Sequence, residues 1–336
     1  MVLNWNGLDD TRACVASLLG QTHGAREVFV VDNASANDEA DVLERELGGQ
    51  IRLIRNADNL GFTGGNNVAM ELALAEGKAR YVALLNNDAA AEPDWLARLV
   101  AAAEAHPEAA VFASHMVFWS NPEITENAGT CLLSTGEAIP RGRGRPRGEF
   151  TEPARLLGAC GGAVLYRADA LRQVGVFRDE FFANFEDVDL SLRLLNTGAE
   201  CLFVPGTFVR HKLNASIAKV RTDAFRIRSV RNMTLAYWIN VPWSVVLLNL
   251  PAQLVSWLLV PPLALLVGQR DLCRILVAGR LAALRQWRAI WRARRELAPM
   301  RRGSSLRIWW RQRSFFGSYA RFFLDVVVRR KRRYME

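Results

Sequence analysis

Three carboxylates stand close together between Phe181 and Arg193, in surroundings suited to acid–base chemistry. Glu186, Asp187 and Asp189 follow a stretch of five residues that holds three phenylalanines. Aromatic neighbours keep water away from a carboxylate and raise its pKa, as a general base requires. Acidic residues also stabilise the first turn of any helix, which by itself would account for Glu186 and Asp189. The aromatic residues favour a catalytic carboxylate in this segment.

A second polar group, Asn86-Asn87-Asp88, follows the apolar run Tyr81–Leu85. Amide and carboxylate oxygens suit Mg²⁺ or Mn²⁺, which usually keep several waters and bind through one or two carboxylates plus substrate phosphates. His211 follows the apolar run Cys201–Val204 and is a candidate second ligand. Ordinary turn chemistry explains the Asn86–Asp88 run equally well, and a lone histidine is more often structural. A divalent-metal site is therefore one of two interpretations of these residues.

Two segments nearer the N-terminus are candidates for nucleotide binding. Asp32 and Asn33 end the apolar run Val28–Val31, where an open sheet presents polar groups to a ribose or a base edge. An Asx-capped turn fits this run as well. The run Asn59–Asn67 is a glycine-rich loop entering a helix, so its N–H groups could approach a ligand closely. It lacks G-x-G-x-x-G spacing and a following P-loop lysine, which argues against a dinucleotide or ATP fold.

The elements that must position these groups alternate between strands and helices in the first hundred residues. Brief apolar runs predict buried strands at Val28–Val31, Ile51–Ile54 and Tyr81–Leu85. Helical spacing and start signals predict helices at Asp10–Leu19, Asp38–Leu47, Asn67–Ala75 and Trp95–Glu104. This alternation predicts an α/β fold with a mainly parallel sheet, helices on both faces and ligands beyond the carboxyl ends of the strands.

The alternation breaks between residues 120 and 155. There the basic, glycine-rich run Arg141–Arg147 predicts a mobile loop. Regular structure returns after Leu156, where a glycine-rich turn precedes a strand expected at Ala163–Tyr166. Further helices are expected at Ala168–Val174 and Asp187–Asn196.

The composition describes a folded chain with two different parts. The 336 residues are 50% hydrophobic, and the five scattered cysteines argue against a secreted disulfide framework or a zinc cluster, so we expect a reducing compartment. The first residues lack a signal-peptide pattern, which predicts a cytosolic N-terminal part. Residues 270–336 hold 19 Lys and Arg against 4 Asp and Glu, whereas residues 1–269 hold 24 against 30. The basic tail is expected to meet an anionic partner, either phospholipid or nucleic acid.

A long uncharged stretch precedes the basic tail. From Asn232 to Gln269 there are 38 residues without a formal charge, more than the ~20 that span a bilayer as a helix. Four prolines interrupt this stretch and arginines flank both ends, which places both ends on the cytoplasmic side. We expect a re-entrant hairpin or in-plane element, with Trp238, Trp243 and Trp257 at the membrane interface. A buried pair of core helices is the alternative.

Beyond this stretch, apolar residues from Val277 to Trp291 recur at helical spacing beside a stripe of arginines. The pattern is typical of a surface helix whose arginines reach lipid phosphates. The run Leu306–Val328, followed by Arg329–Arg333, repeats it. Nucleic-acid binding is the competing interpretation, and we favour lipid because the basic residues alternate with Leu, Val, Phe and Trp. Residues 221–336 are thus expected to form a helical membrane-associated region.

The segments described so far, in this order, resemble the inverting glycosyltransferases of family 2, most closely the bacterial rhamnosyltransferase-like branch. The resemblance covers about the first two-thirds of the chain, and no single motif in it is decisive. The ordered set that carries it is Asn4-Trp5-Asn6-Gly7, Asp32-Asn33-Ala34-Ser35, Asn59-x-Gly-Phe-x-x-Gly-Asn66-Asn67, Asn86-Asn87-Asp88, Gly161-Gly162 and Phe185-Glu186-Asp187-x-Asp-Leu-Ser-Leu-Arg193. The resemblance implies a GT-A fold in residues 1–220 and a nucleotide-diphosphate sugar as donor.

The resemblance also implies catalytic and metal-binding roles. Asp187 would be the catalytic base, with Glu186 beside it in the catalytic motif. Asp88 and His211 would hold Mg²⁺ or Mn²⁺. Asn86 stands where many relatives carry the first acid of a D-x-D motif, which leaves Asp88 as the only charged ligand of that motif.

Donor-binding roles follow by position in the same motifs. Asp32 and Asn59 would contact the nucleoside. The other residues expected to bind substrate are Asn4, Asn6, Asn33, Gly61, Gly65, Asn66, Asn87, Gly161 and Gly162.

The resemblance and the basic tail together predict transfer at the cytoplasmic face of the inner or plasma membrane. The donor is expected to be a sugar nucleotide such as dTDP-rhamnose, and the acceptor a hydroxyl of a lipid-linked or cell-envelope saccharide. An anionic membrane surface is an expected partner and nucleic acid is not. A sugar nucleotidyltransferase would need an early basic, glycine-rich loop, and a processive synthase would need Q-x-x-R-W; neither is present. A degenerate, non-catalytic scaffold that binds sugar nucleotides is the alternative.

Overall fold

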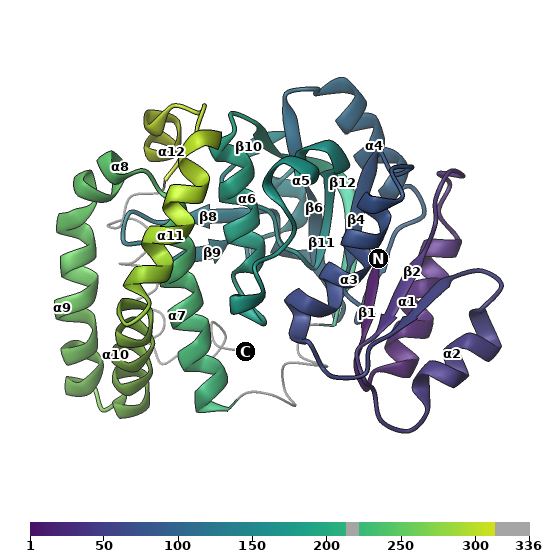
Figure 1. The fold of residues 1–336 in the computed structure, drawn as a ribbon, viewed down its shortest axis with the longest axis horizontal. Coiled ribbons are helices and arrows are strands. Elements are labelled where there is room, and N and C mark those ends of the chain that lie inside the picture. Colours follow the sequence, from purple (N-terminus) through teal and green to yellow (C-terminus); the bar gives the residue numbers. More distant parts are fainter. Residues whose placement is uncertain (213–221, 313–336) are drawn as a thin grey trace. The chain divides into compact units, whose positions relative to one another are not determined.

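The computed structural model describes residues 1–212 and 222–312, and the chain divides into two compact units (Figure 1). The first unit comprises residues 1–130, 140–195 and 199–219. The second unit comprises residues 131–139, 196–198 and 220–336.

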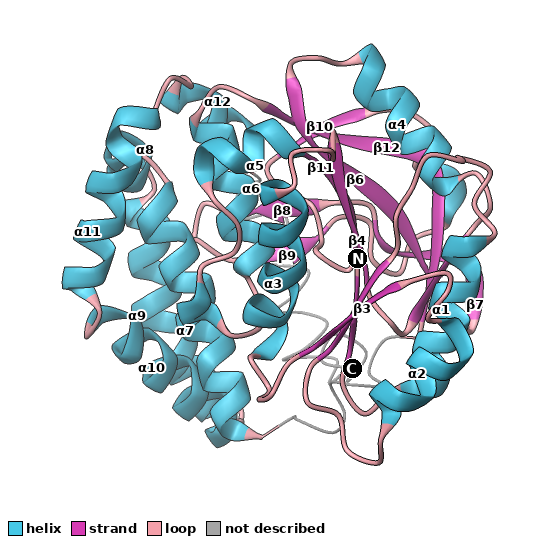
Figure 2. Ribbon diagram, turned by 45° about the vertical axis from the view of Figure 1, so that its right-hand side comes forward, coloured by secondary structure: helices cyan, strands magenta, loops and turns pink. Residues whose placement is uncertain are grey.

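The first unit begins with a parallel sheet of three strands in the order β1-β2-β3. The strands are β1 (Val2–Asn4), β2 (Phe29–Asp32) and β3 (Arg52–Arg55). The helices are α1 (Leu8–Leu19), α2 (Glu39–Leu47) and α3 (Gly61–Ala75). Successive side chains of a strand face opposite sides, so Val30 packs among residues of α1 and α2 while Phe29 and Val31 pack against α3. Helices therefore cover both faces of the sheet, as expected (Figure 2).

A larger sheet of seven strands follows, with the central order β10-β12-β6-β11-β4. Strand β5 pairs with β12, and β7 pairs with β6. The strands are β4 (Tyr81–Leu85), β5 (Ala89–Ala91), β6 (Ala109–Phe118), β7 (Asn121–Asn127), β10 (Ala154–Leu156), β11 (Ala163–Arg167) and β12 (Glu200–His211). The helices beside them are α4 (Trp95–Ala105), α5 (Ala168–Val174) and α6 (Glu186–Asn196). Two short 3₁₀ turns lie at Arg147–Glu149 and Asp179–Phe181.

Two details of this unit differ from the sequence-based expectation. The parallel sheet is confirmed for β1–β3, but the seven-stranded sheet is mixed, and β6 with β12 is the one parallel pair among its described strands. Helix α3 begins at Gly61 instead of Asn67. Its first turn forms early because the side chain of Asn59 accepts from the N–H of Gly61 (2.8 Å), and Phe182 O accepts from the N–H of Thr63 (3.0 Å).

The mobile loop expected at Arg141–Arg147 is a third difference from the sequence-based expectation. The segment lies against β7, where Thr125 N donates to Arg145 O (2.8 Å) and Gly144 N donates to Thr125 O (2.9 Å). The guanidinium of Arg147 lies 4.8 Å from the ring centre of Phe208. Main-chain pairing and arginine–aromatic stacking therefore order a run whose composition alone suggests flexibility.

The part of the second unit that the structure describes, up to residue 312, is helical apart from one small hairpin. Its helices are α7 (Asp223–Asn240), α8 (Trp243–Leu248), α9 (Leu250–Leu266), α10 (Arg270–Leu284), α11 (Trp287–Leu297) and α12 (Ser305–Arg311), with a 3₁₀ turn at Ala298–Met300. The hairpin pairs β8 (Thr130–Leu132) with β9 (Ala138–Pro140). Thr222 caps α7, because its hydroxyl accepts a hydrogen bond from Phe225 N. Helices α7 and α10 pack closely, since a Cβ atom at Gly279 would lie only 2.5 Å from Val230 Cβ.

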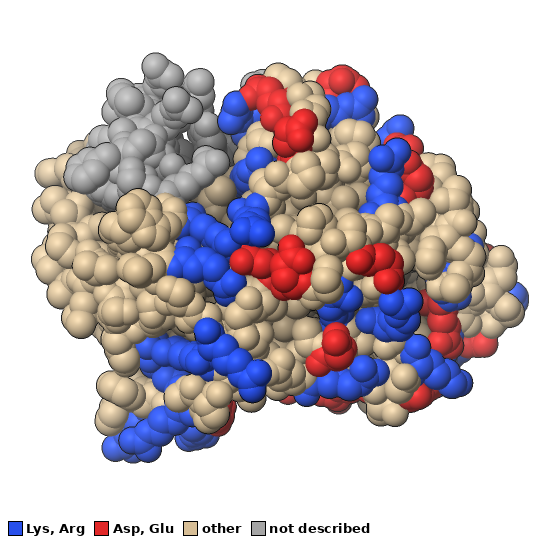
Figure 3. Space-filling model, turned by 90° about the horizontal axis from the view of Figure 1, so that it is seen from above, with Lys and Arg blue, Asp and Glu red and all other residues tan. Residues whose placement is uncertain are grey.

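The uncharged stretch at residues 232–269 forms the end of α7, then α8 and α9. Within residues 1–212 and 222–312 no helix is both long and apolar enough to cross a bilayer. Figure 3 shows an area without charged side chains (tan) on the side where α8 and α9 lie in Figure 1. Of the three tryptophans expected at an interface, Trp243 is exposed, whereas Trp238 and Trp257 stack on each other with ring centres 5.5 Å apart. The run Arg329–Arg333 lies outside the described residues.

Candidate active site

Asn4 holds together the polar loops at the carboxyl ends of β1 and β2. Its Nδ2 lies 2.8 Å from Asp32 Oδ1, 3.0 Å from Ser35 Oγ and 2.9 Å from Glu39 Oε2. Its Oδ1 accepts from Thr11 Oγ1 at 2.7 Å. Because the buried amide uses its capacity inside the protein, Asn4 positions Asp32 rather than presenting a free group to a ligand. Glu39, which the motifs do not single out, is part of this network.

Asn6 and Asp32 fix the loop that follows β2. Asn6 adopts a left-handed conformation (φ 51°), and its Oδ1 accepts from the N–H of Ala36 (2.7 Å). Asp32 is 4% exposed, and its Oδ2 accepts from the N–H of Ser35 (3.1 Å). Carboxylate oxygens each have two acceptor sites, so Asp32 retains capacity for a further donor such as a ribose hydroxyl.

The side chain of Asn33 fixes the turn before α3 through hydrogen bonds. Its Nδ2 donates to Asn59 Oδ1 (2.9 Å) and Gly61 O (3.1 Å), and its Oδ1 accepts from Leu60 N (3.1 Å). Gly61 has φ +71°, and a Cβ atom there would lie 2.5 Å from the carbonyl oxygen of Phe182. A glycine is required at that position because this turn lies directly against the loop that precedes α6.

Gly65 and Asn66 lie inside α3 and serve its packing in this structure. A Cβ atom at Gly65 would lie 2.5 Å from Leu3 Cδ1, so the glycine lets α3 approach β1. Asn66 Nδ2 donates to Phe62 O (2.8 Å) within the helix. Asn87 likewise points towards α1, with Nδ2 3.2 Å from Thr11 Oγ1.

Asp88 and His211 meet at the ends of β4 and β12, although 123 positions separate them in sequence. Asp88 Oδ1 lies 3.0 Å from His211 Nε2, and both side chains are 8% exposed. Asn86 Nδ2 lies 3.4 Å from the same nitrogen. Burial alone would lower the pKa of His211, but the neighbouring carboxylates outweigh it and raise that pKa to about 10.

The second carboxylate on His211 belongs to Glu126, a residue that the sequence analysis missed. Glu126 Oε2 lies 2.7 Å from His211 Nδ1. This contact fixes the ring so that Nε2 faces Asp88, as carboxylates behind metal-bound histidines do. Glu126 lies in the segment expected to be irregular, and no motif or local spacing marks it.

Asp187 lies at the start of α6 with its carboxylate held by main-chain donors. Its Oδ2 accepts from Gly161 N (2.8 Å) and its Oδ1 from Val188 N (2.7 Å). Burial raises the pKa of Asp187 despite these hydrogen bonds. Glu186 is 5% exposed, and burial and then the Asp187 charge raise its pKa well above the usual range. Within the described residues, Glu186 Oε2 has no hydrogen-bond partner.

The Gly161-Gly162 pair connects Asp187 to the Asn86–Asp88 segment. Gly161 N bonds Asp187, while Gly162 O accepts from Asn86 N at 2.9 Å. A Cβ atom at Gly162 would lie 3.0 Å from Asn86 Nδ2. The structure therefore brings the expected base and the expected metal ligands to one edge of the larger sheet.

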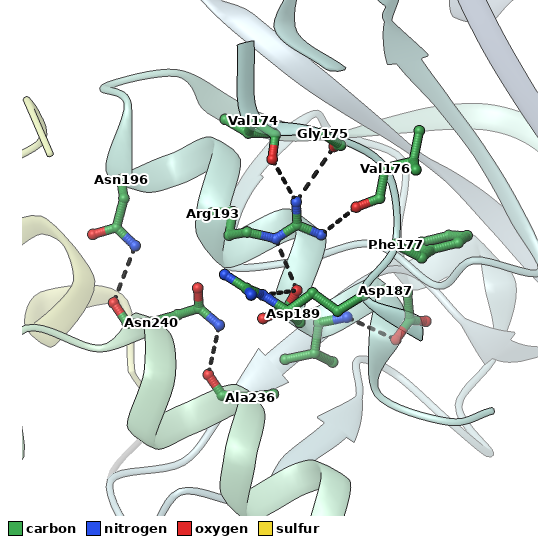
Figure 4. Close-up of polar contacts among 12 residues, drawn as sticks. Val174, Gly175, Val176, Phe177, Asp187, Asp189, Arg193, Asn196, Ala236 and Asn240 are labelled. Atoms are coloured by element: carbon green, nitrogen blue, oxygen red, sulfur yellow. Dashed lines mark hydrogen bonds and ion pairs between the residues drawn. The ribbon is translucent and has the colours of Figure 1, made fainter. Parts of the chain in front are cut away.

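The loop before α6 is strained and anchored. Phe182, Asn184 and Phe185 all have positive φ (61°, 71° and 68°), each at a cost of about 1–3 kcal/mol. The helix behind it is held by Arg193, whose guanidinium donates to Asp189 and to three carbonyl groups of residues 174–176 (Figure 4). This anchoring keeps the first turn of α6, and with it Asp187, in place.

The donor set around Asp88 fits a divalent cation that arrives with a diphosphate. Among the residues that the structure describes, no cluster of three or more His, Cys, Asp and Glu has the arrangement of a complete metal cage. Asp88 and His211 supply one carboxylate and one imidazole, and Mg²⁺ or Mn²⁺ commonly completes such a pair with phosphate oxygens and water. The expected pair would therefore supply two of the six ligands of an octahedral cation.

The sequence pattern that defines glycosyl transferase family 2 matches residues 1–175. The chain belongs to this family. Over 244 residues it is 28% identical to the uncharacterized protein y4gI of Sinorhizobium fredii, covering 67% of this chain and 25% of that protein. Over 88 residues it is 31% identical to WfaP of Escherichia coli, a UDP-Glc:α-D-GlcNAc-diphosphoundecaprenol β-1,3-glucosyltransferase, covering 26% of this chain and 34% of WfaP. The chain thus spans about a quarter to a third of these relatives.

Solved structures of glycosyltransferases share the fold of this family member. GalNAc-T7 with UDP, GalNAc and Mn²⁺ superposes with a TM-score of 0.57 at 15% identity, covering 86% of this chain and 56% of that one. The mannosyltransferase PcManGT of Pyrobaculum calidifontis with GDP-Man and Mn²⁺ gives a TM-score of 0.52 at 15% identity, covering 89% and 84%. These similarities confirm the expected GT-A-like α/β fold.

Proposed function

We propose that the chain transfers a sugar from a nucleotide-diphosphate sugar to an acceptor hydroxyl, with inversion at the anomeric carbon. The observation that carries the proposal is the path from Asp187 Oδ2 through the main chain of Gly161 and Gly162 to Asn86, whose Nδ2 lies 3.4 Å from His211 Nε2. It places a carboxylate of raised pKa at the same sheet edge as Asp88 and His211, which would hold a metal diphosphate once His211 has lost its proton.

In this mechanism Asp187 Oδ2 or Oδ1 takes the proton of the acceptor hydroxyl as its oxygen attacks the anomeric carbon. The bond from that carbon to the diphosphate breaks as the new glycosidic bond forms, so a single displacement inverts the centre. Negative charge then develops on the leaving diphosphate. A divalent cation held by Asp88 and His211 would stabilise that charge. The carboxylate of Asp32 would accept a hydrogen bond from a ribose hydroxyl.

Several sugar nucleotides are candidate donors. WfaP uses UDP-Glc by its name, and the two solved relatives contain UDP and GDP-Man. dTDP-rhamnose joins these as a candidate because the motif set resembles rhamnosyltransferases. A thermal-shift panel of UDP-, GDP- and dTDP-sugars, with and without Mn²⁺ or Mg²⁺, would identify the donor, since a ligand at 100 times its Kd stabilises by about 2.7 kcal/mol.

Two outcomes test the assignment of the metal ligands. We expect Asp88→Ala to abolish the extra rise in unfolding temperature that metal gives in the presence of the donor. Any rise that the nucleotide gives without metal should persist. An unchanged metal-dependent shift in this variant would refute the role of Asp88. A shift with a donor, but no hydrolysis or transfer of any donor, would favour a non-catalytic scaffold that binds sugar nucleotides.

We further propose a lipid-linked saccharide as the acceptor and the cytoplasmic face of the membrane as the location. The support is the diphosphoundecaprenol acceptor in the name of WfaP and the surplus of 15 positive charges in residues 270–336. Transfer of labelled sugar to organic-extractable material in membranes that contain the protein would test it. Product found only in the aqueous phase would refute the lipid-linked acceptor.

A further inference from the structure

Helix α9 buries its polar side chains and exposes apolar ones, which is the opposite of a helix on a water-facing surface. Its two polar side chains, Gln253 and Ser256, are buried at 4% and 0% exposure. Gln253 Nε2 lies 3.2 Å from the hydroxyl of Tyr237, and Ser256 Oγ lies 2.8 Å from Glu137 Oε1. Both contacts lie within the second unit. A water-facing helix does the opposite, because it turns its polar residues outward and its apolar residues inward.

The outward side of α9 carries apolar residues alone. Leu258 is 64% exposed and Leu266 is 82% exposed. Three further leucines of the helix are 48–53% exposed: Leu254, Leu259 and Leu265. Leu247 and Leu248 of α8 extend the exposed apolar residues towards the N-terminal side. Single exposed leucines are ordinary, but an uninterrupted apolar helix face marks a surface that is covered in use.

The neighbouring residues indicate what covers this face. Trp243 at the start of α8 and Trp291 of α11 are 39% and 46% exposed, with ring centres 5.4 Å apart. On α11, Arg288, Arg292 and Arg295 are exposed. Indole rings gather at membrane–water interfaces, and arginines at that level pair with anionic headgroups. A second copy docked symmetrically on this face would bring like charges together, which argues for lipid over self-association.

The length of α9 decides how it would sit in lipid. Its 17 residues correspond to about 25 Å of helix, less than the ~30 Å hydrocarbon core. We propose that the outer face of α8 and α9 inserts into the acyl-chain boundary of an anionic bilayer, with α9 parallel to the membrane plane. This surface, the α9 lipid face, gives the proposed membrane location a residue-level basis; it rests on that location and not on sugar transfer.

Vesicle flotation of the full chain tests the α9 lipid face. The probes are vesicles of phosphatidylcholine alone and of phosphatidylcholine with phosphatidylglycerol. We expect Leu258→Gln/Leu266→Gln to weaken partitioning into both by roughly a hundredfold, about tenfold for each leucine withdrawn. The control is Trp119→Gln in the first unit, where the side chain is 41% exposed, and it should change partitioning by less than about threefold.

A second variant separates the charge contribution from the apolar one. Arg288→Gln/Arg292→Gln should weaken binding to the phosphatidylglycerol vesicles by about thirtyfold, because each arginine near an anionic surface contributes about 1 kcal/mol. Binding to phosphatidylcholine alone should stay within about twofold, since no surface charge is then present.

The proposal is overturned if the double glutamine variant of α9 floats like the parent. It is also overturned if the parent does not float, and light scattering would then show whether a dimer that the α9 substitutions dissociate covers the face instead. Cleavage of the chain after residue 312 that creates flotation absent from the parent would mean that residues 313–336 cover the face, and would overturn it too. The unfolding temperature without ligand, measured on every variant, shows whether each remains folded and keeps the proposed transferase function a separate question.

Discussion

Removing the guanidinium of Arg193 should destabilise the first unit strongly. Arg193 is buried, with Nε 2.8 Å from Asp189 Oδ2 and three carbonyl groups of residues 174–176 within 3.3 Å of its terminal nitrogens (Figure 4). Arg193→Met keeps much of the apolar stem and leaves the buried Asp189 carboxylate without its best partner. Loss of one member of a buried ion pair typically costs 3–5 kcal/mol. Arg178 remains 3.6 Å from Asp189, so we expect about 3–4 kcal/mol.

Differential scanning calorimetry would measure the effect. For a unit of this size, a change of 3–4 kcal/mol lowers Tm by roughly 6–16 °C. The matched control is Arg172→Met on α5, where the exposed guanidinium reaches only Leu74 O and Ala79 O at 3.4 and 3.5 Å. That variant should stay within about 0.5 kcal/mol of the parent.

A double variant checks the stated cause. If the cost arises from the stranded Asp189 charge, Asp189→Asn/Arg193→Met should be more stable than Arg193→Met alone by about 1–2 kcal/mol. A Tm for Arg193→Met that matches the Arg172→Met control would refute the assigned role of the ion pair. Further loss in the double variant would show that the carbonyl contacts, and not the charge, carry the stability.

Three further predictions concern the site itself. Asp187→Asn should lower kcat by roughly a hundred- to ten-thousandfold while the donor thermal shift stays unchanged, and near-normal turnover would exclude Asp187 as the base. Glu126→Gln should weaken Mn²⁺ affinity in the presence of nucleotide by about 10–100-fold in calorimetric titration, whereas Glu123→Gln, on the same strand but exposed, should not. Because burial and the Asp187 charge raise the pKa of Glu186, the folded protein binds more protons than the unfolded chain above about pH 4.5, and this residue's contribution to stability falls as pH rises. Glu186→Gln should therefore raise Tm relative to the parent at pH 8, with a gain that shrinks towards pH 4; a gain independent of pH would contradict the assignment.

The sequence by itself determined the elements whose signal is local. The strand at Tyr81–Leu85 and the helix at Ala168–Val174 form with the expected bounds, because apolar runs and helical spacing act over neighbouring residues. The polar residues after β4 and at the start of α6 were also found, since polar groups directly after an apolar run are visible without a fold. The order of these motifs was enough to indicate the family.

The tertiary structure alone decided which of these groups meet. Glu126 reaches His211 through two strand pairings. Strand β12 pairs with β6 so that His211 lies opposite Phe118. Strand β6 in turn pairs with β7 so that Met116 lies opposite Asn127, next to Glu126. These registers join positions 85 residues apart, and no local pattern encodes them. The ordering of Arg141–Arg147 has the same origin, since its partners lie on β7 and β12.

The early start of α3 and the exposed leucines of α9 are two further features that the sequence alone does not determine. The sequence showed that residues 61–67 are rich in glycine and asparagine and that residues 232–269 lack charge. Only the fold showed that Phe182 O accepts from Thr63 N in the first turn of α3, and that Gln253 and Ser256 point inward while the leucines of α9 point outward. Composition fixes which groups a segment carries, whereas the direction in which each group faces depends on partners that are distant in the chain.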